Sequence, residues 1–435
     1  MGERQHPVRL EIDDDLGRNR LTVFFRLLLA IPHGIWLFLW SIAALLAWIA
    51  NWFATLVRGQ PPRALHRFLS AYVRYAAHVN AYVLLAANPY PGFTGEPGSY
   101  PVDVALPAEP QPQERWKTFL RIILVLPAAV LSALLGGTLA LSTGSSNFYV
   151  SGRKGRYGGG SPLSTGALAL VCAFLGWFAS LVRGRMPRGF RDAVAYGIGY
   201  GAQTLAYLLL VTDRYPNSDP IALLVDVEPP PEHVVSITVD DDLKRSRLTV
   251  FFRVLLAVPH IIWLLLWSLA AILAGIVQWV AALVTGRPMP ALHRFLSAYV
   301  RYRAHVYAFL FLVGNPFPGF VGAPGTYPVD VTMPPPEPQR RVVTFFRILL
   351  AIPAWIVQSV LEYVLAAAAV FMWFVALATG RAPQGLRNVG AYAIRYGAQT
   401  YAYEFLVTDR YPHASPLEGR ESTLRPEEPE LAGLG

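Results

Sequence analysis

Long apolar runs alternate with short polar segments along this chain, and the alternation recurs four times. The first run covers residues 22–57 and contains Arg26 as its only charged residue. A stretch of about 20 apolar residues is enough to cross a bilayer. Each run is followed by a basic turn and a second, more polar helical segment. The copies begin RLTVFFRLLLAIPH, KTFLRIILVLP, LTVFFRVLLAVPH and VTFFRILLAIP. Self-similarity of this kind predicts a protein built from repeats.

The four copies pair into two halves. Residues 13–104 align with residues 240–331 without a gap, so that His66 matches His293. We therefore expect repeats at 1–110, 111–230, 231–336 and 337–415, followed by a polar C-terminal tail at 416–435. The second repeat carries a Gly/Ser-rich insert at about 136–165.

Short runs of alternating polarity lie before and between the repeats, at residues 7–12, 100–106, 222–228, 234–239 and 327–333. In the first, Val8, Leu10 and Ile12 point to one side, which is the period of a half-buried strand. Because single short strands are unstable, we expect one small sheet outside the bilayer, assembled from all the junctions. Every junction then lies on the same side of the membrane. Each repeat crosses the membrane an even number of times or not at all.

Within a repeat, the sequence predicts two helices. We expect the first to begin after the aspartate triplets 13–15 and 240–242, and to kink at Pro32, Pro127, Pro259 or Pro353. The second should cover residues 64–87 in the first repeat. The insert falls opposite Ser41, which brings that position near a membrane surface because such a segment cannot sit in hydrocarbon. Two interpretations stay open: either residues 21–40 lie partly in the membrane plane and the crossing begins near Ser41, or the run is a tight hairpin.

Composition changes this picture little. The chain of 435 residues is 54% hydrophobic and only 15% charged, with a mean hydropathy of +0.37. Soluble domains are closer to a quarter charged. The predicted fold class is a mainly α, polytopic helical membrane protein of four pseudo-repeats with a small extramembrane β-sheet. Its polar, acidic start contains no cleavable signal peptide, so the predicted location is the cell membrane, multi-pass.

Several ionisable residues are candidates for function. Charge inside an apolar segment is a functional hypothesis by default, although a long side chain near a segment end can also extend to the interface. The intramembrane polar candidates are Arg26, Arg121, Arg253, Arg347 and Glu362. A second set follows one stripe of the second helices and suits anionic lipid head groups. These lipid-binding candidates are Arg67, Arg74, His78, Arg294, Arg301, His305 and Arg395.

Catalytic signatures do not stand out in the sequence. It has no GxSxG motif, no phosphate-binding Walker motif and no HExxH pattern, and its single cysteine, Cys172, is flanked by apolar residues. We therefore expect no enzyme activity, no cofactor and no metal. The net charge of +9 comes mostly from arginines beside apolar segments. That placement suits lipid phosphates better than nucleic acid.

The recurring series FFRxLLAIPH, then TG or RG with proline, then YxRYxAxxxAY, then YPxF, resembles the bacterial family called domain of unknown function 4389. The resemblance covers residues 21–412 in four copies. It implies a repeat-built membrane protein and supplies no catalytic residues. We expect a non-enzymatic scaffold or accessory subunit that engages anionic lipid and a partner protein, or itself. The alternative is a transporter or channel, because such proteins place their sites at broken helices of internal repeats.

Overall fold

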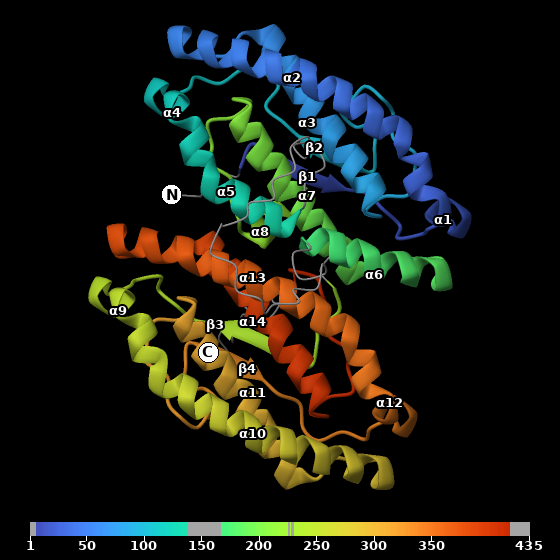
Figure 1. Ribbon diagram of the computed structural model, residues 1–435, viewed down its shortest axis with the longest axis vertical. Helices are drawn as coiled ribbons and strands as arrows, with labels where there is room; N and C mark the ends of the chain where they lie inside the picture. The colour runs from blue at the N-terminus through green and yellow to red at the C-terminus, as the bar shows by residue number, and fades with distance from the viewer. Residues whose placement is uncertain (1–5, 137–166, 225–226, 228–229, 418–435) are drawn as a thin grey trace, which may run out of the picture.

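Each quarter of the chain forms one long helical segment followed by one shorter, more polar helix. The computed structural model describes residues 6–136, 167–224, 227 and 230–417 (Figure 1). The long segments are α1 (Arg20–Leu29) with α2 (Ile31–Arg58), α4 (Arg115–Phe119) with α5 (Arg121–Leu135) and α6 (Leu168–Arg183), α9 (Arg247–Phe251) with α10 (Arg253–Thr285), and α12 (Arg341–Phe345) with α13 (Arg347–Thr379). The second helices are α3 (Arg63–Val83), α7 (Arg188–Leu208), α11 (Pro290–Leu310) and α14 (Gln384–Glu404).

The first helix begins after the aspartates, as predicted, but not directly after them. It begins at Arg20, where the side chain of Asn19 accepts hydrogen bonds from the first backbone N–H groups. Asp14 instead binds Arg18 at 2.8 Å, and Leu16, with φ 64°, turns the chain between them. An aspartate that bonds its own turn offers the backbone an alternative to helix.

The long segments are continuous through the position of the insert. α2 passes unbroken through Ser41, and α13 passes unbroken through Glu362. The hairpin interpretation is therefore wrong. In the second quarter the insert separates α5 from α6, and apart from Gly136 the insert lies outside the described residues.

The predicted proline kinks take a different form. Pro259 lies inside α10, and the helix breaks earlier, at Phe252. Pro127 and Pro353 lie inside α5 and α13 in the same way. In the first quarter the break is at Ala30, so that Pro32 stands in the first turn of α2, where its missing N–H costs no hydrogen bond.

The junction strands form two sheets, so the prediction of one sheet is wrong. β1 (Arg9–Ile12) pairs antiparallel with β2 (Val102–Ala105), and β3 (Ser236–Val239) pairs antiparallel with β4 (Val329–Thr332). The fifth predicted strand begins as a short helix, α8 (Pro220–Leu223), and part of it lies outside the described residues.

A helix, not a further strand, lies next to the start of each sheet. In the first half Gln203 of α7 donates to the carbonyl of Val8 at 2.8 Å. In the second half Gln399 of α14 donates to the carbonyl of Val235 at 3.0 Å. The two halves therefore build their sheets separately.

Within a half, the two quarters exchange contacts reciprocally. Arg20 at the start of the first quarter donates to Val182 O at the end of α6, at 2.9 Å, and Arg115 donates to Val57 O at the end of α2, at 3.0 Å. Arg247 and Arg341 repeat this exchange in the second half. The halves meet where α13 packs against α5 and α6, across the middle of Figure 1, and α2 and α10 lie at its two ends.

The core lies among the second helices. In α7 every residue from Arg191 to Tyr207 is buried. α3 packs on α7, and α11 packs on α14. The long segments surround this core and leave most of their own side chains outside it.

Candidate membrane interface

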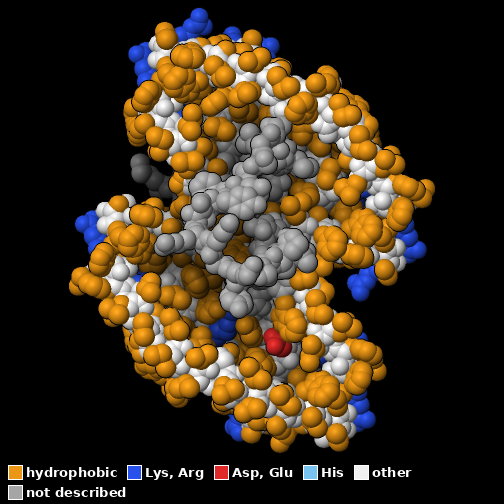
Figure 2. Space-filling model, viewed as in Figure 1, with side chains coloured by type: hydrophobic (Ala, Val, Ile, Leu, Met, Phe, Trp, Pro, Cys, Tyr) orange, Lys and Arg blue, Asp and Glu red, His pale blue; other side chains and the backbone are white. Residues whose placement is uncertain are grey.

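The outward faces of the long helices are apolar. Leu21 is 68% exposed, Val57 75% and Leu265 71%. Figure 2 shows hydrophobic side chains spread over the described long helices on one broad face of the molecule. Monomeric soluble proteins rarely expose contiguous apolar patches larger than a few hundred Å². A surface of this kind marks a site of contact with a membrane or with another protein.

Among the described residues, three helical segments are long and apolar enough to cross a membrane. They are Arg20–Arg58 with 39 residues, Arg253–Thr285 with 33 and Arg347–Thr379 with 33. In the second quarter α5 and α6 are shorter apolar helices that take the equivalent place. Length and composition therefore suggest that the protein associates with membranes.

Positive charge gathers at both ends of these segments. Each begins with an exposed arginine and is followed at its end by another: Arg20 and Arg58, Arg115 and Arg183, Arg247 and Arg287, and Arg341 and Arg381. In Figure 2 most basic side chains lie along the outline. Exposed acidic residues are found on the strands and loops instead, for example Glu11, Asp13 and Glu96.

Four arginines of the long segments are buried, which corrects the interpretation that they extend to the membrane surface. Arg26, Arg121, Arg253 and Arg347 are at most 2% exposed. Arg26 donates to Tyr82 O at 2.7 Å and to Ala87 O at 3.0 Å. These carbonyls stand where α3 ends, and the last carbonyls of a helix lack partners within it.

The same arrangement recurs in the third and fourth quarters. Arg347 donates to Tyr403 O at 2.6 Å and to Thr408 O at 2.9 Å, where α14 ends. Arg253 donates to Gly314 O at 2.5 Å, where α11 ends. A cation at the C-terminal end of a helix also complements the helix dipole. Each guanidinium lies over an aromatic ring as well: Tyr82, Tyr207, Phe309 or Tyr403. We call this arrangement the arginine clamp. In the second quarter Arg121 binds the side chains of Gln113 and Asp213 in place of the helix-end carbonyls.

A second polar side chain completes each clamp and differs between quarters. In the first quarter it is Arg18, which donates to Leu85 O at 2.8 Å, and Arg245 takes its place in the third. In the second quarter it is Gln113, which donates to Leu210 O at 2.6 Å and accepts from Arg121. In the fourth it is Gln339, which accepts from Arg347 at 2.7 Å.

The lipid-binding candidates do not form one exposed stripe. His78 and Arg74 both bind Asp103 of β2, with Nε2–Oδ1 and Nε–Oδ1 distances of 2.8 Å and 3.3 Å. His305 and Arg301 bind Asp330 in the same way. Arg395 is buried and donates to Ser415 O. Arg67 and Arg294 are exposed and remain available to lipid head groups.

These contacts fasten the loop after α3 to the sheet. Burial by itself would raise the pKa of Asp103, but the hydrogen bonds from His78 and from the N–H groups of Gly98 and Val104 outweigh it and lower the pKa. Asp330 has the same partners in its own half and its pKa is lowered likewise. Each aspartate is therefore held ionised.

Replacing Asp103 with asparagine should destabilise the fold by about 1–3 kcal/mol, because a buried acceptor loses charge-assisted hydrogen bonds. An acid with a lowered pKa stabilises the fold above its ordinary value of 3.8 and loses that contribution as pH falls below it. Unfolding in detergent followed between about pH 6 and pH 3 should show the difference from wild type shrinking towards acid. Glu96→Gln, at an exposed position, is the control, and a difference that does not depend on pH would contradict this assignment.

Glu362 has a partner that sequence reasoning missed. Its carboxylate accepts from Arg303 of α11 at 2.9 Å and from Gln358 at 3.1 Å. The Arg303 guanidinium is stacked between the rings of Tyr307 and Tyr401, at 4.0 Å and 4.2 Å. Alignment of the two halves contained a signal for this pair. Arg303 aligns with Ala76 and Glu362 aligns with Gly136, so the second half has a charged residue at both positions where the first half has a small one.

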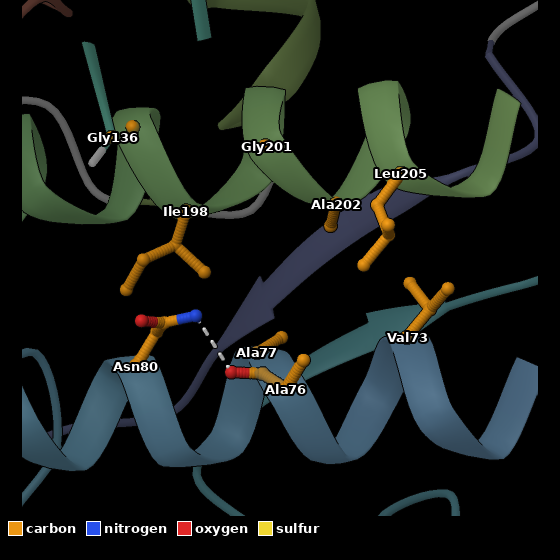
Figure 3. A pocket seen from close by; sticks show the side chains of 10 residues that line it. Val73, Ala76, Ala77, Asn80, Gly136, Ile198, Gly201, Ala202 and Leu205 are labelled. Atoms are coloured by element: carbon orange, nitrogen blue, oxygen red, sulfur yellow. Dashed lines mark hydrogen bonds between the residues drawn. The ribbon is translucent and has the colours of Figure 1, made fainter. Parts of the chain in front are cut away.

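The equivalent place in the first half is a small cavity between α3 and α7. Figure 3 shows Asn80 pointing into it towards Ile198, with Ala76 and Gly201 along its walls. Its volume is about 20 Å³, enough for about one water molecule. Asn80 Nδ2 donates to Ala76 O at 2.9 Å. The centre of one half thus holds a charged pair, and the other holds a nearly filled space between small residues.

Comparison with known proteins agrees with the repeat structure. The model of a domain of unknown function, DUF4389, matches residues 20–94, 164–218, 247–321 and 341–415. Neither the curated proteins nor the solved structures gave a match. These four matches contain the arginine-clamp helices of every quarter, except for the first part of the second quarter. The chain therefore belongs to the DUF4389 family, as four tandem copies of its domain.

Proposed function

We propose that this protein is a non-enzymatic membrane scaffold whose long helices lie in the plane of one leaflet of the cell membrane. In this proposal the apolar face of Figure 2 is buried among lipid chains. The sheets and loops remain in water, where they can engage a partner protein. The observation that carries the proposal is that the long segments expose apolar side chains at both of their ends.

The length of the segments supports an in-plane position over a crossing. At 1.5 Å per residue, the 39 residues of Arg20–Arg58 extend over about 58 Å, whereas the hydrocarbon core is about 30 Å thick. Leu21 and Val57 are both largely exposed at its two ends. A crossing that kept both in hydrocarbon would need a tilt beyond the range of about 0–40° seen for membrane helices. An in-plane helix meets the condition without a tilt.

The pseudo-symmetry supports the same position. In Figure 1 the long segments of all four quarters run across the view, roughly perpendicular to the shortest axis of the molecule. The junction strands pair within each half. An even number of crossings per quarter, including none, keeps all junctions on one side, and the in-plane arrangement is the case with none. The multi-pass topology expected from the hydrophobic runs is the alternative that the experiment below tests.

The charge distribution supports contact with anionic lipids. Exposed arginines stand at both ends of each long segment, and Arg67 and Arg294 add to them on the second helices. A basic residue near an anionic membrane surface contributes about 1 kcal/mol, screened by salt. A ring of such residues around an apolar face is the pattern of a protein that lies in the interface.

Transport has less support. A pathway through the protein would need polar groups that face one another in a shared cavity. Arg26 and Arg253 lie in different halves, and each binds carbonyls at or just beyond the end of its own second helix. Glu362 is occupied by Arg303 and Gln358. Each of these groups has partners that explain it without a transported substrate.

The proposal predicts that both ends of a long segment are labelled from the same side of the membrane. Single cysteines are introduced into a Cys172→Ser background at Asp15 and Gln60, which flank the first segment, and at Asp242 and Arg287, which flank the third. All four positions are exposed. In vesicles of known orientation, a membrane-impermeant maleimide should react with both members of each pair from one side only.

A matched control fixes what each result means. The same reaction after detergent permeabilisation gives full labelling and shows that every cysteine is reactive. If Asp15→Cys and Gln60→Cys react from opposite sides, the segment crosses the membrane and the in-plane proposal fails. The cysteines at positions 242 and 287 must also react from the same side as each other, because the repeats share their fold.

A further inference from the structure

An apolar cavity of about 630 Å³ lies where the two halves of the molecule meet. Leu131 of α5 forms one wall, and Phe371 and Phe374 of α13 form another. Asn217 and Leu386 contribute as well. Ligand sites in proteins commonly have volumes of about 300–1,000 Å³, are mostly apolar and occur where domains meet.

The chemistry of the lining selects the ligand. Aromatic and aliphatic side chains dominate it, and none of the residues that line it is charged. Phe374, on its wall, is 61% exposed, and Ile123 and Val130 of the neighbouring α5 are exposed as well. The cavity is therefore continuous with the apolar surface that lipid covers in the proposed function. A free carboxylate would find no cation within it.

We propose that this cavity holds one acyl chain of a membrane phospholipid, whose head group remains outside the cavity. The inference rests on the proposed membrane association of the same face. The chain fills a space between α5 and α13 that the two halves leave unpacked. A phospholipid would then belong to the joint between the halves and help to hold them together.

The pseudo-symmetric position across the same joint supplies a control. There, Phe190 stands in place of Leu386 and His413 stands in place of Asn217. Both side chains pack closely against the facing glycine: an added Cβ would meet the His413 ring at 3.1 Å at Gly189, and would meet Asn217 Oδ1 at 2.9 Å at Gly385. At these two positions the sister site carries the bulkier side chains, whereas Leu175 stands there in place of Phe371. The chain itself provides the residues that should fill the cavity.

The filling residues also fit the local backbone. Asn217 Oδ1 accepts from Asp219 N at 3.0 Å, and His413 Nδ1 accepts from Ser415 N at 3.2 Å in the equivalent turn. Gln203 and Gln399 each accept the next bond, from the N–H groups of Asn217 and His413. Histidine at position 217 can therefore keep the turn intact.

The test compares wild type with the double variant Asn217→His, Leu386→Phe. Protein purified in detergent is analysed by native mass spectrometry for retained phospholipid, which should be about one molecule per chain in wild type. The double variant should retain at least about fivefold less, equivalent to about 1 kcal/mol. The reverse variant at the sister position, His413→Asn with Phe190→Leu, should retain as much as wild type or more.

A photoactivatable phospholipid with a diazirine in its chain identifies the place of binding. We expect it to label peptides that contain Leu131 or Phe371, and the label should be lost in the double variant. A second variant, Val375→Trp, narrows the cavity from the opposite wall and guards against misfolding of the first. Equal labelling in wild type and in correctly folded variants would overturn the proposal. Labelling by a photoactivatable fatty acid and not by the phospholipid would overturn the assignment to phospholipid.

These measurements are made in detergent and do not depend on how the helices lie in a bilayer. Failure of the in-plane arrangement would appear in the maleimide experiment and leave lipid retention unchanged. Failure of the cavity proposal would leave the maleimide result unchanged. The two proposals can therefore fail separately.

Discussion

Replacing Arg347 with methionine should destabilise the protein by about 3–5 kcal/mol, because it breaks a buried charged network from one side. Methionine keeps much of the side-chain volume but donates no hydrogen bond. Asp409, bound at 2.6 Å, loses its partner, and so do the carbonyls of Tyr403 and Thr408. Buried acceptors left without donors account for most of the expected loss. The measurement is the thermal unfolding midpoint in detergent, by circular dichroism or by fluorescence of the tryptophans.

Two further variants show whether the clamp itself is responsible. Arg253 binds two backbone carbonyls, Gly314 O and Asn315 O, and no carboxylate, so Arg253→Met should cost less than Arg347→Met. Arg341 is exposed and makes one bond to Val284 O, so Arg341→Met should change stability by less than about 0.5 kcal/mol. If all three variants unfold at the same temperature as wild type, the clamp does not stabilise the fold.

Placing three glutamates on the outer face of α10 should move the protein from the membrane fraction to the soluble or aggregated fraction. Leu265, Leu269 and Leu273 are exposed and spaced four residues apart, so they form one stripe on that helix. A charged residue in the hydrocarbon region costs about 2.5–3.5 kcal/mol on insertion scales, and three of them act on one helix. The measurement is the fraction of protein that remains in the membrane pellet after alkaline carbonate treatment.

The matched control places the same charge where the proposed function leaves the surface in water. Ser99, Thr238 and Thr332 are exposed positions on the loops and strands. Glutamate at all three should leave the membrane fraction as in wild type. If the variant of α10 also stays in the membrane pellet, that helix does not contact lipid, and the apolar face needs another cover, such as a second protein.

Local pattern was enough to predict much of the fold. The four copies, the strands at residues 9–12 and 102–105, and the membrane-length apolar helices all follow from short-range periodicity. Such features depend on neighbours within a few residues, which the sequence displays directly. Alignment of the two halves also held the signal for the pair of Arg303 and Glu362, because Ala76 and Gly136 replace them.

Other features depended on which quarter packs against which. A guanidinium beside apolar residues can extend to the surface or bind a helix end, and the end of α3 comes to Arg26 only when the quarter folds. The same holds for His78, which looks like part of a basic stripe until Asp103 of β2 reaches it. The pairing of the junction strands into two sheets likewise depended on tertiary contacts, and Gln203 of α7 binds the backbone before β1.

By itself, then, the sequence determined the repeats, the helices and the apolar character of the long segments, because each is set by local periodicity and hydrophobicity. The tertiary structure decided the partners of the buried arginines, the separation of the two sheets and the cavity between the halves. Those outcomes depend on contacts between residues such as Leu131 and Phe371, which are far apart in the chain and meet only when the second and fourth quarters pack together. Long-range packing of this kind has no local signal.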